Sequence, residues 1–140
     1  MANGMIVATL RILPRPERRG DVLEILRSIP GPVLTQPGCD ACRIYEELGP
    51  EDAVVLFERW GSAAALEAHV RSEAFRRVLG AVEHSGREPE IHFDQVSASE
   101  GIELVERVRG LARTTDGEAR PVAVDAGPTR RNRTRGESQT

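Results

Sequence analysis

The alternation of short apolar segments with Pro and Gly breaks constrains this chain more than any other feature of its sequence. Four segments are rich in β-branched and apolar residues and are bounded by turn-forming residues, which is typical of β-strands. A four-residue loop, Gly49–Asp52, separates the second from the third and predicts a β-hairpin. The predicted strands are Met5–Leu13, Cys42–Leu48, Val54–Trp60 and Ile91–Val96.

Two segments with helical spacing separate these strands, one after the first strand and one after the third. The first segment begins near Pro16, which suits an opening helical turn, and ends at Pro30–Pro32. Ser62 is predicted to cap the second segment, and Ser72 to cap a further part of it before the break at Gly86–Pro89. The residues on the predicted inner faces are Val22, Leu23, Leu26 and Ile29 in the first segment, and Leu66, His69, Val70, Phe75, Val78, Leu79 and Val82 in the second.

The resulting order is strand, helix, strand, strand, helix, strand. This is the βαββαβ order of a ferredoxin-like α+β fold, and it predicts an antiparallel sheet with both helices on one face. The other face also carries apolar and aromatic side chains, such as Val55 and Phe57. A sheet that is apolar on both faces needs a second cover. The simplest cover is the same sheet of a second copy, so we predict a two-fold homodimer.

The C-terminal third of the chain has a different composition. Ser99–Arg113 has helical spacing of Ile, Val and Leu, with Ser99 as the expected N-cap. This helix could clasp a partner subunit or fray on the surface. From Thr114 onward the chain is polar and has no periodicity, which is typical of disorder, and its arginine-rich end indicates a solvated tail. We therefore predict one folded domain over residues 1–113 and a disordered tail over residues 114–140.

Composition excludes several classes of function. The basic residues number 19 and all are arginine, which rules out Schiff-base chemistry on lysine and a Walker-type phosphate loop. The net charge of −3 does not favour nucleic acid or an anionic membrane as a partner. No apolar run is long enough to cross a bilayer, and the first residues do not have the pattern of a signal peptide. These features predict a cytoplasmic protein.

The two cysteines have the spacing of a dithiol motif, Cys39-x-x-Cys42. Redox pairs of this kind usually lie at a helix N-terminus, whereas this pair enters a strand after Pro37-Gly38. A structural zinc site needs four ligands, and the sequence has no second cysteine pair. We therefore expect two small buried side chains, and a reversible disulfide remains the alternative.

Several short motifs carry a resemblance to a known family, and they occur in the same order and with the same spacing. The motifs are Pro37–Tyr45 (PGCDACRIY), Phe57–Trp60 (FERW), Ala65–His69 (ALEAH) and Ser72–Phe75 (SEAF). Together they resemble the antibiotic biosynthesis monooxygenase (ABM) family and its quinol monooxygenase branch. The resemblance extends from about Met5 to Val96.

The resemblance implies a dimeric α+β barrel with a pocket between each sheet and its helices. Some members oxidise phenols or quinols with dioxygen and need no metal or flavin, whereas others bind haem and degrade it. Haem-degrading members have an asparagine in the first strand, and Val7–Arg11 contains none, which argues against haem degradation and leaves haem binding open. The first hypothesis is a cofactor-independent monooxygenase acting on a quinol or phenol. The alternative is a non-catalytic dimer that binds a hydrophobic metabolite or haem.

The resemblance also places Trp60 and His69 at the pocket. Histidine can exchange a proton near neutral pH, so His69 is the predicted catalytic base that deprotonates the substrate. The predicted substrate-binding residues are Trp60, Glu58 and Phe75, with Trp60 as a flat wall for an aromatic ring. Glu58 could instead pair with an arginine, and Trp60 and His69 could be ordinary core residues. No metal or cofactor is expected.

Overall fold

The computed structural model describes residues 4–111 and divides the chain into two units, Met1–Ala98 and Ser99–Thr140. The predicted disordered tail over residues 114–140 lies outside the described residues. Within residues 4–111, no helix has the length and apolar character that a bilayer crossing requires.

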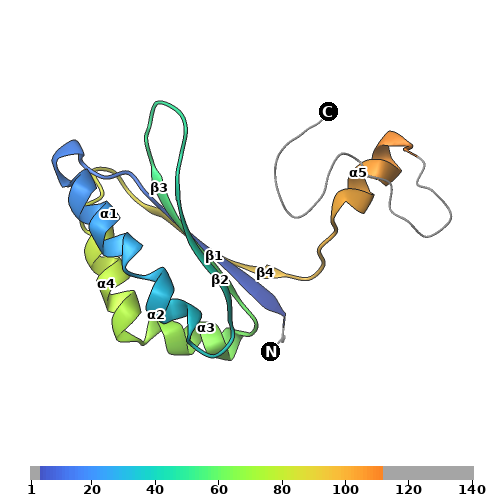
Figure 1. Cartoon of the computed structure of the whole chain (residues 1–140), viewed down its shortest axis with the longest axis horizontal. Helices are drawn as coiled ribbons and strands as arrows, with labels where there is room; N and C mark the ends of the chain where they lie inside the picture. The colour runs from blue at the N-terminus through green and yellow to red at the C-terminus, as the bar shows by residue number, and fades with distance from the viewer. Residues whose placement is uncertain (1–3, 112–140) are drawn as a thin grey trace. The chain divides into compact units, whose positions relative to one another are not determined.

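The first unit contains a four-stranded antiparallel sheet, which confirms the predicted α+β fold. Its strands are β1 (Met5–Ile12), β2 (Cys39–Glu46), β3 (Val54–Trp60) and β4 (Glu90–Val96). They lie in the order β2-β3-β1-β4, so β3 and β1 are the two central strands. The helices of this unit all lie on one face of the sheet (Figure 1).

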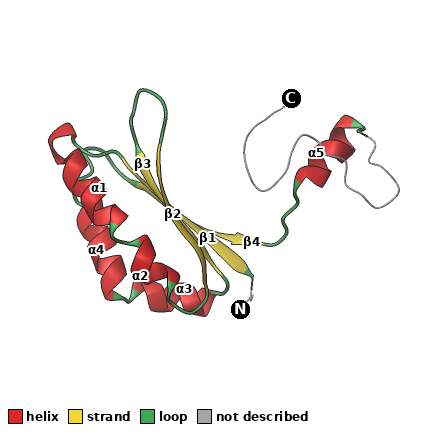
Figure 2. Ribbon diagram, viewed as in Figure 1, coloured by secondary structure: helices red, strands yellow, loops and turns green. Residues whose placement is uncertain are grey.

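Four α-helices and one 3-10 turn form that layer (Figure 2). The hydroxyl of Ser62 accepts the backbone N–H of Ala65, and the hydroxyl of Ser72 accepts that of Phe75. Both predicted N-caps are therefore confirmed. The elements are η1 (Pro16–Arg18), α1 (Arg19–Arg27), α2 (Pro30–Leu34), α3 (Ala63–Val70) and α4 (Glu73–Val82).

The structure corrects the sequence prediction in several places within this unit. Val70 and Leu79, predicted on the inner faces of their helices, are 42% and 45% exposed. Pro30 begins the short helix α2 instead of only ending α1. A proline in the first helical turn loses no intrahelical hydrogen bond, because the N–H groups of that turn have no partner in the helix. Strand β2 begins at Cys39 instead of Cys42, since a β-bulge around Asp40 lets the chain pair with the end of β3 earlier than its apolar pattern indicated.

The second unit contains α5 (Ile102–Arg109). Its N-cap is Gly101 and not the predicted Ser99. The carboxylate of Glu103, in the first turn, accepts the backbone N–H of Gly101 at 3.1 Å. Gly110, with φ +73°, ends the helix in the left-handed conformation that glycine adopts without strain.

The core of the first unit lies between the sheet and its helices. Residues of β1 and β3 alternate strictly between buried and partly exposed positions, as expected for strands with one covered face. The buried set extends from Ile6 and Leu10 on β1 to Val22 and Leu26 on α1 and Val78 on α4. This packing holds α3 and α4 against β3, where the candidate site lies.

The opposite face of the sheet has no helix of the first unit on it, among residues 4–98 (Figure 1). It carries partly exposed apolar side chains, including Val7, Val55 and Phe57. Tyr45 contacts Phe57 edge to face, with ring centroids 6.3 Å apart, and Arg59 lies 5.6 Å from the Phe57 ring. This surface is called the open face below.

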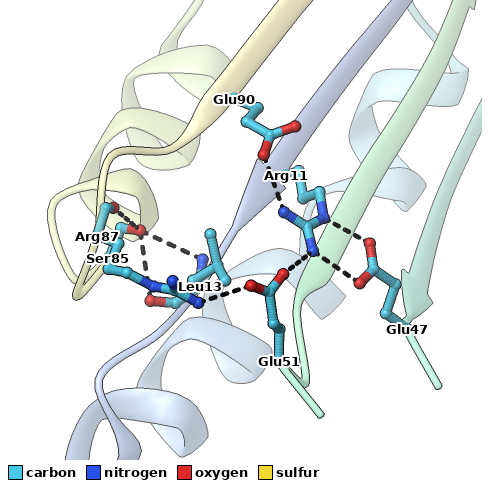
Figure 3. Close-up of polar contacts among 7 residues, drawn as sticks. All are labelled: Arg11, Leu13, Glu47, Glu51, Ser85, Arg87 and Glu90. Carbon is cyan, nitrogen blue, oxygen red and sulfur yellow. Dashed lines mark hydrogen bonds and ion pairs between the residues drawn. The ribbon is translucent and has the colours of Figure 1, made fainter. Parts of the chain in front are cut away.

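Arg11 joins three parts of the open face at one end of the sheet (Figure 3). Its guanidinium binds Glu47 through two nitrogens at 2.5 and 2.9 Å, Glu51 at 2.6 Å and Glu90 at 2.9 Å. Glu51 also pairs with Arg87 at 3.0 Å. The hydrogen bonds from Arg11 lower the pKa of Glu47 and Glu51, and those carboxylates raise the pKa of Arg11. One arginine therefore connects β1, the β2–β3 loop and β4.

We predict that Arg11→Met lowers the melting temperature at pH 7, because the carboxylates lose their shared cation. Carboxyl groups whose pKa falls on folding stabilise the protein above their unfolded pKa of 4.5 and lose that effect as pH falls through the lower folded value. The difference between wild type and variant should therefore shrink below about pH 4.5. Arg43→Met, on the same face, is the matched control. An Arg11→Met effect that is equal at pH 7 and pH 3 would contradict this account.

Candidate functional site

Four side chains predicted from the sequence lie together under the helices. Glu58 and Trp60 are two residues apart on β3, so both point to the helix-covered face. His69 points inward from α3, and Phe75 lies in the first turn of α4. Glu58, Trp60 and His69 are 0–1% exposed, and Phe75 is 6% exposed. The local sequence produces this arrangement because Ser62 starts α3 directly after Trp60, which turns the His69 face of α3 back onto β3.

The carboxylate of Glu58 is bound on both oxygens. Trp60 Nε1–H donates to Oε1 at 3.0 Å, and His69 Nε2 lies 3.1 Å from Oε2. Glu58 therefore pairs with an indole and an imidazole, and not with an arginine, the alternative partner predicted from the sequence. A buried carboxylate without such partners would be strongly destabilising, so these two hydrogen bonds explain why a Glu can occupy the interior of β3.

The imidazole of His69 is also held by aromatic rings. It stacks on Trp60, with ring centroids 4.6 Å apart and an interplanar angle of 27°. Phe75 contacts it edge to face at 5.4 Å and 82°. The ring of His69 is thus fixed in orientation by three neighbours: a carboxylate at one edge and an aromatic ring on each of two sides.

Gln36 completes the arrangement, and sequence reasoning missed it. Its Oε1 lies 2.9 Å from His69 Nδ1, on the side of the ring opposite Glu58. Gln36 is half-buried and lies in the turn between α2 and β2. A contact across 33 residues leaves no local pattern, and α2, which places this turn, was itself not predicted. Gln36, His69, Glu58 and Trp60 together are called the polar chain below.

A pocket of about 570 Å³ lies beside the polar chain. Its lining is mainly small and apolar, and Gln36 is the member of the polar chain that contributes to it. The lining residues are Gln36, Pro37, Gly38, Ser62, Ala64, Ala65, Ala68 and Ser72. Glu58, Trp60, His69 and Phe75 do not line this pocket, so a ligand bound in it meets Gln36 before it meets His69.

Gly38 brings the turn that carries Gln36 close to α3. Its φ of +84° is in the left-handed region, and a Cβ built on it would lie 2.5 Å from the Cβ of Ala65. The carbonyl of Gly38 accepts the N–H of Gly61 at 2.8 Å, which ties this turn to the end of β3. Only glycine allows both the backbone conformation and the close contact that form this wall of the pocket.

The β-bulge at Asp40 places both cysteines on the helix-covered face, because Cys39 pairs with Trp60 and Cys42 with Glu58. Both are free thiols. Cys42 is buried, as expected from the sequence, whereas Cys39 is only partly buried, contrary to that expectation. Burial raises the pKa of Cys39 and raises that of Cys42 to about 12, with Glu58 adding to each effect. Both groups therefore favour the neutral thiol, which is a poor nucleophile. Among residues 4–111, no three or more His, Cys, Asp or Glu side chains are grouped to hold a metal ion.

Comparison with protein families gives a match over more than half of the chain. Residues 5–80 match the family described as antibiotic biosynthesis monooxygenase. A relative from Synechocystis, the uncharacterized protein sll1783, is 26% identical over 78 residues, which cover 56% of this chain and 53% of that protein. The present chain thus spans about half the length of that relative.

Solved structures with the same fold come from several organisms. Rv0793 from Mycobacterium tuberculosis has a TM-score of 0.63 and 23% identity, and the match covers 69% of this chain and 99% of that one. A Caulobacter crescentus protein, described as a candidate antibiotic biosynthesis monooxygenase, has a TM-score of 0.61 and 18% identity, with 69% and 92% covered. At these identities the likeness establishes the fold alone.

We predict that Gly38→Ala destabilises the protein by about 1–3 kcal/mol, because alanine meets both a positive φ and a clash with Ala65. Gly20→Ala is the matched control. A Cβ at Gly20, in α1, meets nothing within 4 Å, so this change should stabilise by roughly 0.5–1 kcal/mol. Urea unfolding measures both. Equal effects of the two substitutions would show that the Gly38 turn is not as tightly packed as described.

A second prediction concerns Glu58, whose two oxygens both accept hydrogen bonds. Glu58→Gln keeps the size of the side chain but replaces one acceptor with an amide donor, so it should destabilise by about 1–3 kcal/mol. Glu67→Gln, at an exposed position of α3, should change stability by less than about 0.5 kcal/mol. The measurement is the free energy of unfolding of each variant. A Glu58→Gln variant as stable as Glu67→Gln would show that the two hydrogen bonds to the Glu58 carboxylate do not stabilise the fold.

Proposed function

Because the chain belongs to the antibiotic biosynthesis monooxygenase family, we propose that it oxidises a phenol or quinol with dioxygen, without a metal or flavin. The observation that supports this function is the imidazole of His69, held between Glu58 and Gln36 beside an apolar pocket. Such an arrangement suits the removal of a proton from a small aromatic hydroxyl compound.

Glu58 determines which nitrogen of His69 serves as the base. An ionised carboxylate only accepts hydrogen bonds, so the proton of a neutral His69 lies on Nε2, toward Glu58. Its lone pair is then on Nδ1, the nitrogen that faces Gln36, and the amide of Gln36 is turned so that its nitrogen donates there, because its oxygen could only accept. When Nδ1 takes a proton, the Glu58 carboxylate stabilises the resulting imidazolium, as the aspartate of a catalytic triad does for its histidine.

The substrate supplies the electrons in this proposal. Loss of the hydroxyl proton to His69 leaves an electron-rich phenolate, which passes electrons to dioxygen. One oxygen atom enters the ring to give a quinone, and the other leaves as water with the two hydrogens removed from the substrate. The protein contributes orientation, a proton acceptor and a pocket with a mainly apolar lining.

The aromatic residues contribute through His69 in this arrangement. Trp60 and Phe75 pack on its ring and are themselves buried, so they hold the base in place. The substrate-binding roles predicted for Trp60, Glu58 and Phe75 stay predictions, because those residues lie behind His69 as seen from the 570 Å³ pocket. Pocket residues Ala64, Ala65 and Ala68 offer an apolar surface of suitable character for an aromatic ring.

One observation favours a second candidate function, a dimeric protein that binds a hydrophobic metabolite or haem without chemistry. His69 is 1% exposed, and its ring nitrogens are both occupied by protein groups. A ligand could therefore fill the pocket without touching the base. Binding that survives loss of His69, together with no turnover, would identify this function.

In either function we propose that a second copy of the chain covers the open face. Val7, Val55 and Phe57 would pack on their counterparts, with the sheets of two copies face to face. Phe57→Asp should shift the protein to monomer in sedimentation, whereas Glu67→Gln should not. The surface that this homodimer would bury is on the opposite face of the sheet from the candidate site.

The test of the oxygenase function is oxygen uptake by the metal-stripped protein with a panel of reduced quinols and phenols. We expect uptake above a protein-free blank, which accounts for autoxidation. His69→Ala should reduce kcat by roughly 10²-fold or more, the usual contribution of a general base. His84→Ala, at a half-buried histidine near the end of α4, is the control and should keep full activity.

Two results would count against this function. No uptake above the blank with any compound would exclude oxidation of that panel and favour the binding function. Uptake that is equal in wild type and His69→Ala would exclude His69 as the base, even if the protein is an oxygenase.

A further inference from the structure

We propose that Gln36 is the positioning residue of this site and that it competes with the ligand for His69. The amide of Gln36 contacts Nδ1 of His69, and a ligand hydroxyl reaches that nitrogen by taking the place of the amide. This inference rests on the proposed use of the pocket, and it concerns a residue that lies outside the motifs of the sequence.

The first support is the position of Gln36 between the base and the pocket. Its side chain lines the 570 Å³ pocket and also contacts Nδ1 of His69 at 2.9 Å. On the other side of His69, Glu58 and Trp60 are fully buried, so the ring has no approach from there. The side chain of Gln36 therefore lies between the pocket and Nδ1 of His69, on the path that a ligand hydroxyl would take.

The second support is that the backbone of Gln36 is held, while its side chain has one side-chain hydrogen-bond partner among residues 4–111. The backbone N–H donates to the carbonyl of Val33 at 2.9 Å, and the carbonyl accepts the N–H of Cys39 at 3.2 Å. The neighbouring Gly38 fixes the turn against Ala65. Rotation about the side-chain bonds of Gln36 therefore breaks the contact with His69 and leaves the turn in place.

The third support is the chemistry of a carboxamide, which satisfies either protonation state of His69. Its oxygen accepts a hydrogen bond from an imidazolium Nδ1–H, and its nitrogen, after a half-turn of the amide, donates to the lone pair of the neutral ring. A carboxylate or an ammonium group would favour one state only. Gln36 thus keeps Nδ1 hydrogen-bonded before a ligand arrives, without fixing its charge.

The test uses Gln36→Ala and Gln36→Asn, with Gln95→Ala as the matched control. Gln95 is exposed on β4, so its variant makes the same chemical change away from the site. The probe is 4-nitrophenol, which has a hydroxyl and an absorbance that reports its ionisation. Binding is followed by that absorbance, and the ring of His69 by ¹⁵N NMR of histidine-labelled protein.

We expect both Gln36 variants to bind the probe about three- to tenfold more tightly, because the competing hydrogen bond is absent. The factor corresponds to the usual net strength of one hydrogen bond. Asparagine retains an amide but is one methylene shorter, so it should behave like alanine if competition at Nδ1 is the cause. The ¹⁵Nδ1 signal of His69 should shift in both variants without ligand, and in wild type when the probe binds. Gln95→Ala should change neither.

If the enzyme oxidises a quinol, kcat and KM distinguish the proposed role of Gln36 at His69 from a role in folding alone. Gln36→Ala should lower KM with little change in kcat, since in the substrate complex the amide has already left Nδ1 of His69. Weaker probe binding in Gln36→Ala, or unchanged affinity with an unchanged His69 spectrum, would overturn the inference. Tighter binding with a shifted His69 signal but no oxygen uptake in wild type would support the role of Gln36 and reject the oxygenase function.

Discussion

The buried carboxylate of Glu58 is the constraint on which the rest of the site depends. A carboxyl group in the interior of a sheet needs hydrogen-bond partners, and here Trp60 and His69 supply them. Trp60 must therefore lie two residues along the same strand, and α3 must return over β3 so that His69 reaches the second oxygen. The position of Trp60 on β3, the Ser62 cap and the packing of α3 together bring both partners to Glu58.

The sequence predicted those parts of the fold that local patterns encode. Strict alternation in β1 and β3 and the caps at Ser62 and Ser72 follow from neighbouring residues, and they are enough to bring Glu58, Trp60 and His69 to one face. The β-bulge at Asp40 depends on pairing with β3, so the pattern of β2 alone misplaced the strand start. Helix α2 was missed because a Pro-Gly-Pro segment is typical of a break and is also allowed in a first helical turn.

Gln36 shows why the site could be predicted only in part. Its contact with His69 depends on α2, on the left-handed conformation of Gly38 and on the close approach of Gly38 to Ala65, and none of these has a local signal. The sequence also could not predict whether His69 is buried, because inward residues of a helix can either line a cavity or fill a core. In the structure His69 is a core residue, and Gln36 is the residue of the polar chain that lines the pocket.

The two faces of the sheet separate assembly from chemistry. Side chains alternate along β3, so Phe57 and Arg59 lie on the open face while Glu58 and Trp60 lie beneath the helices. A substitution at Phe57 therefore changes the surface proposed for a second copy without touching the polar chain. The backbone of β3 is nevertheless common to both faces, and a shift of this strand would move Glu58 relative to His69.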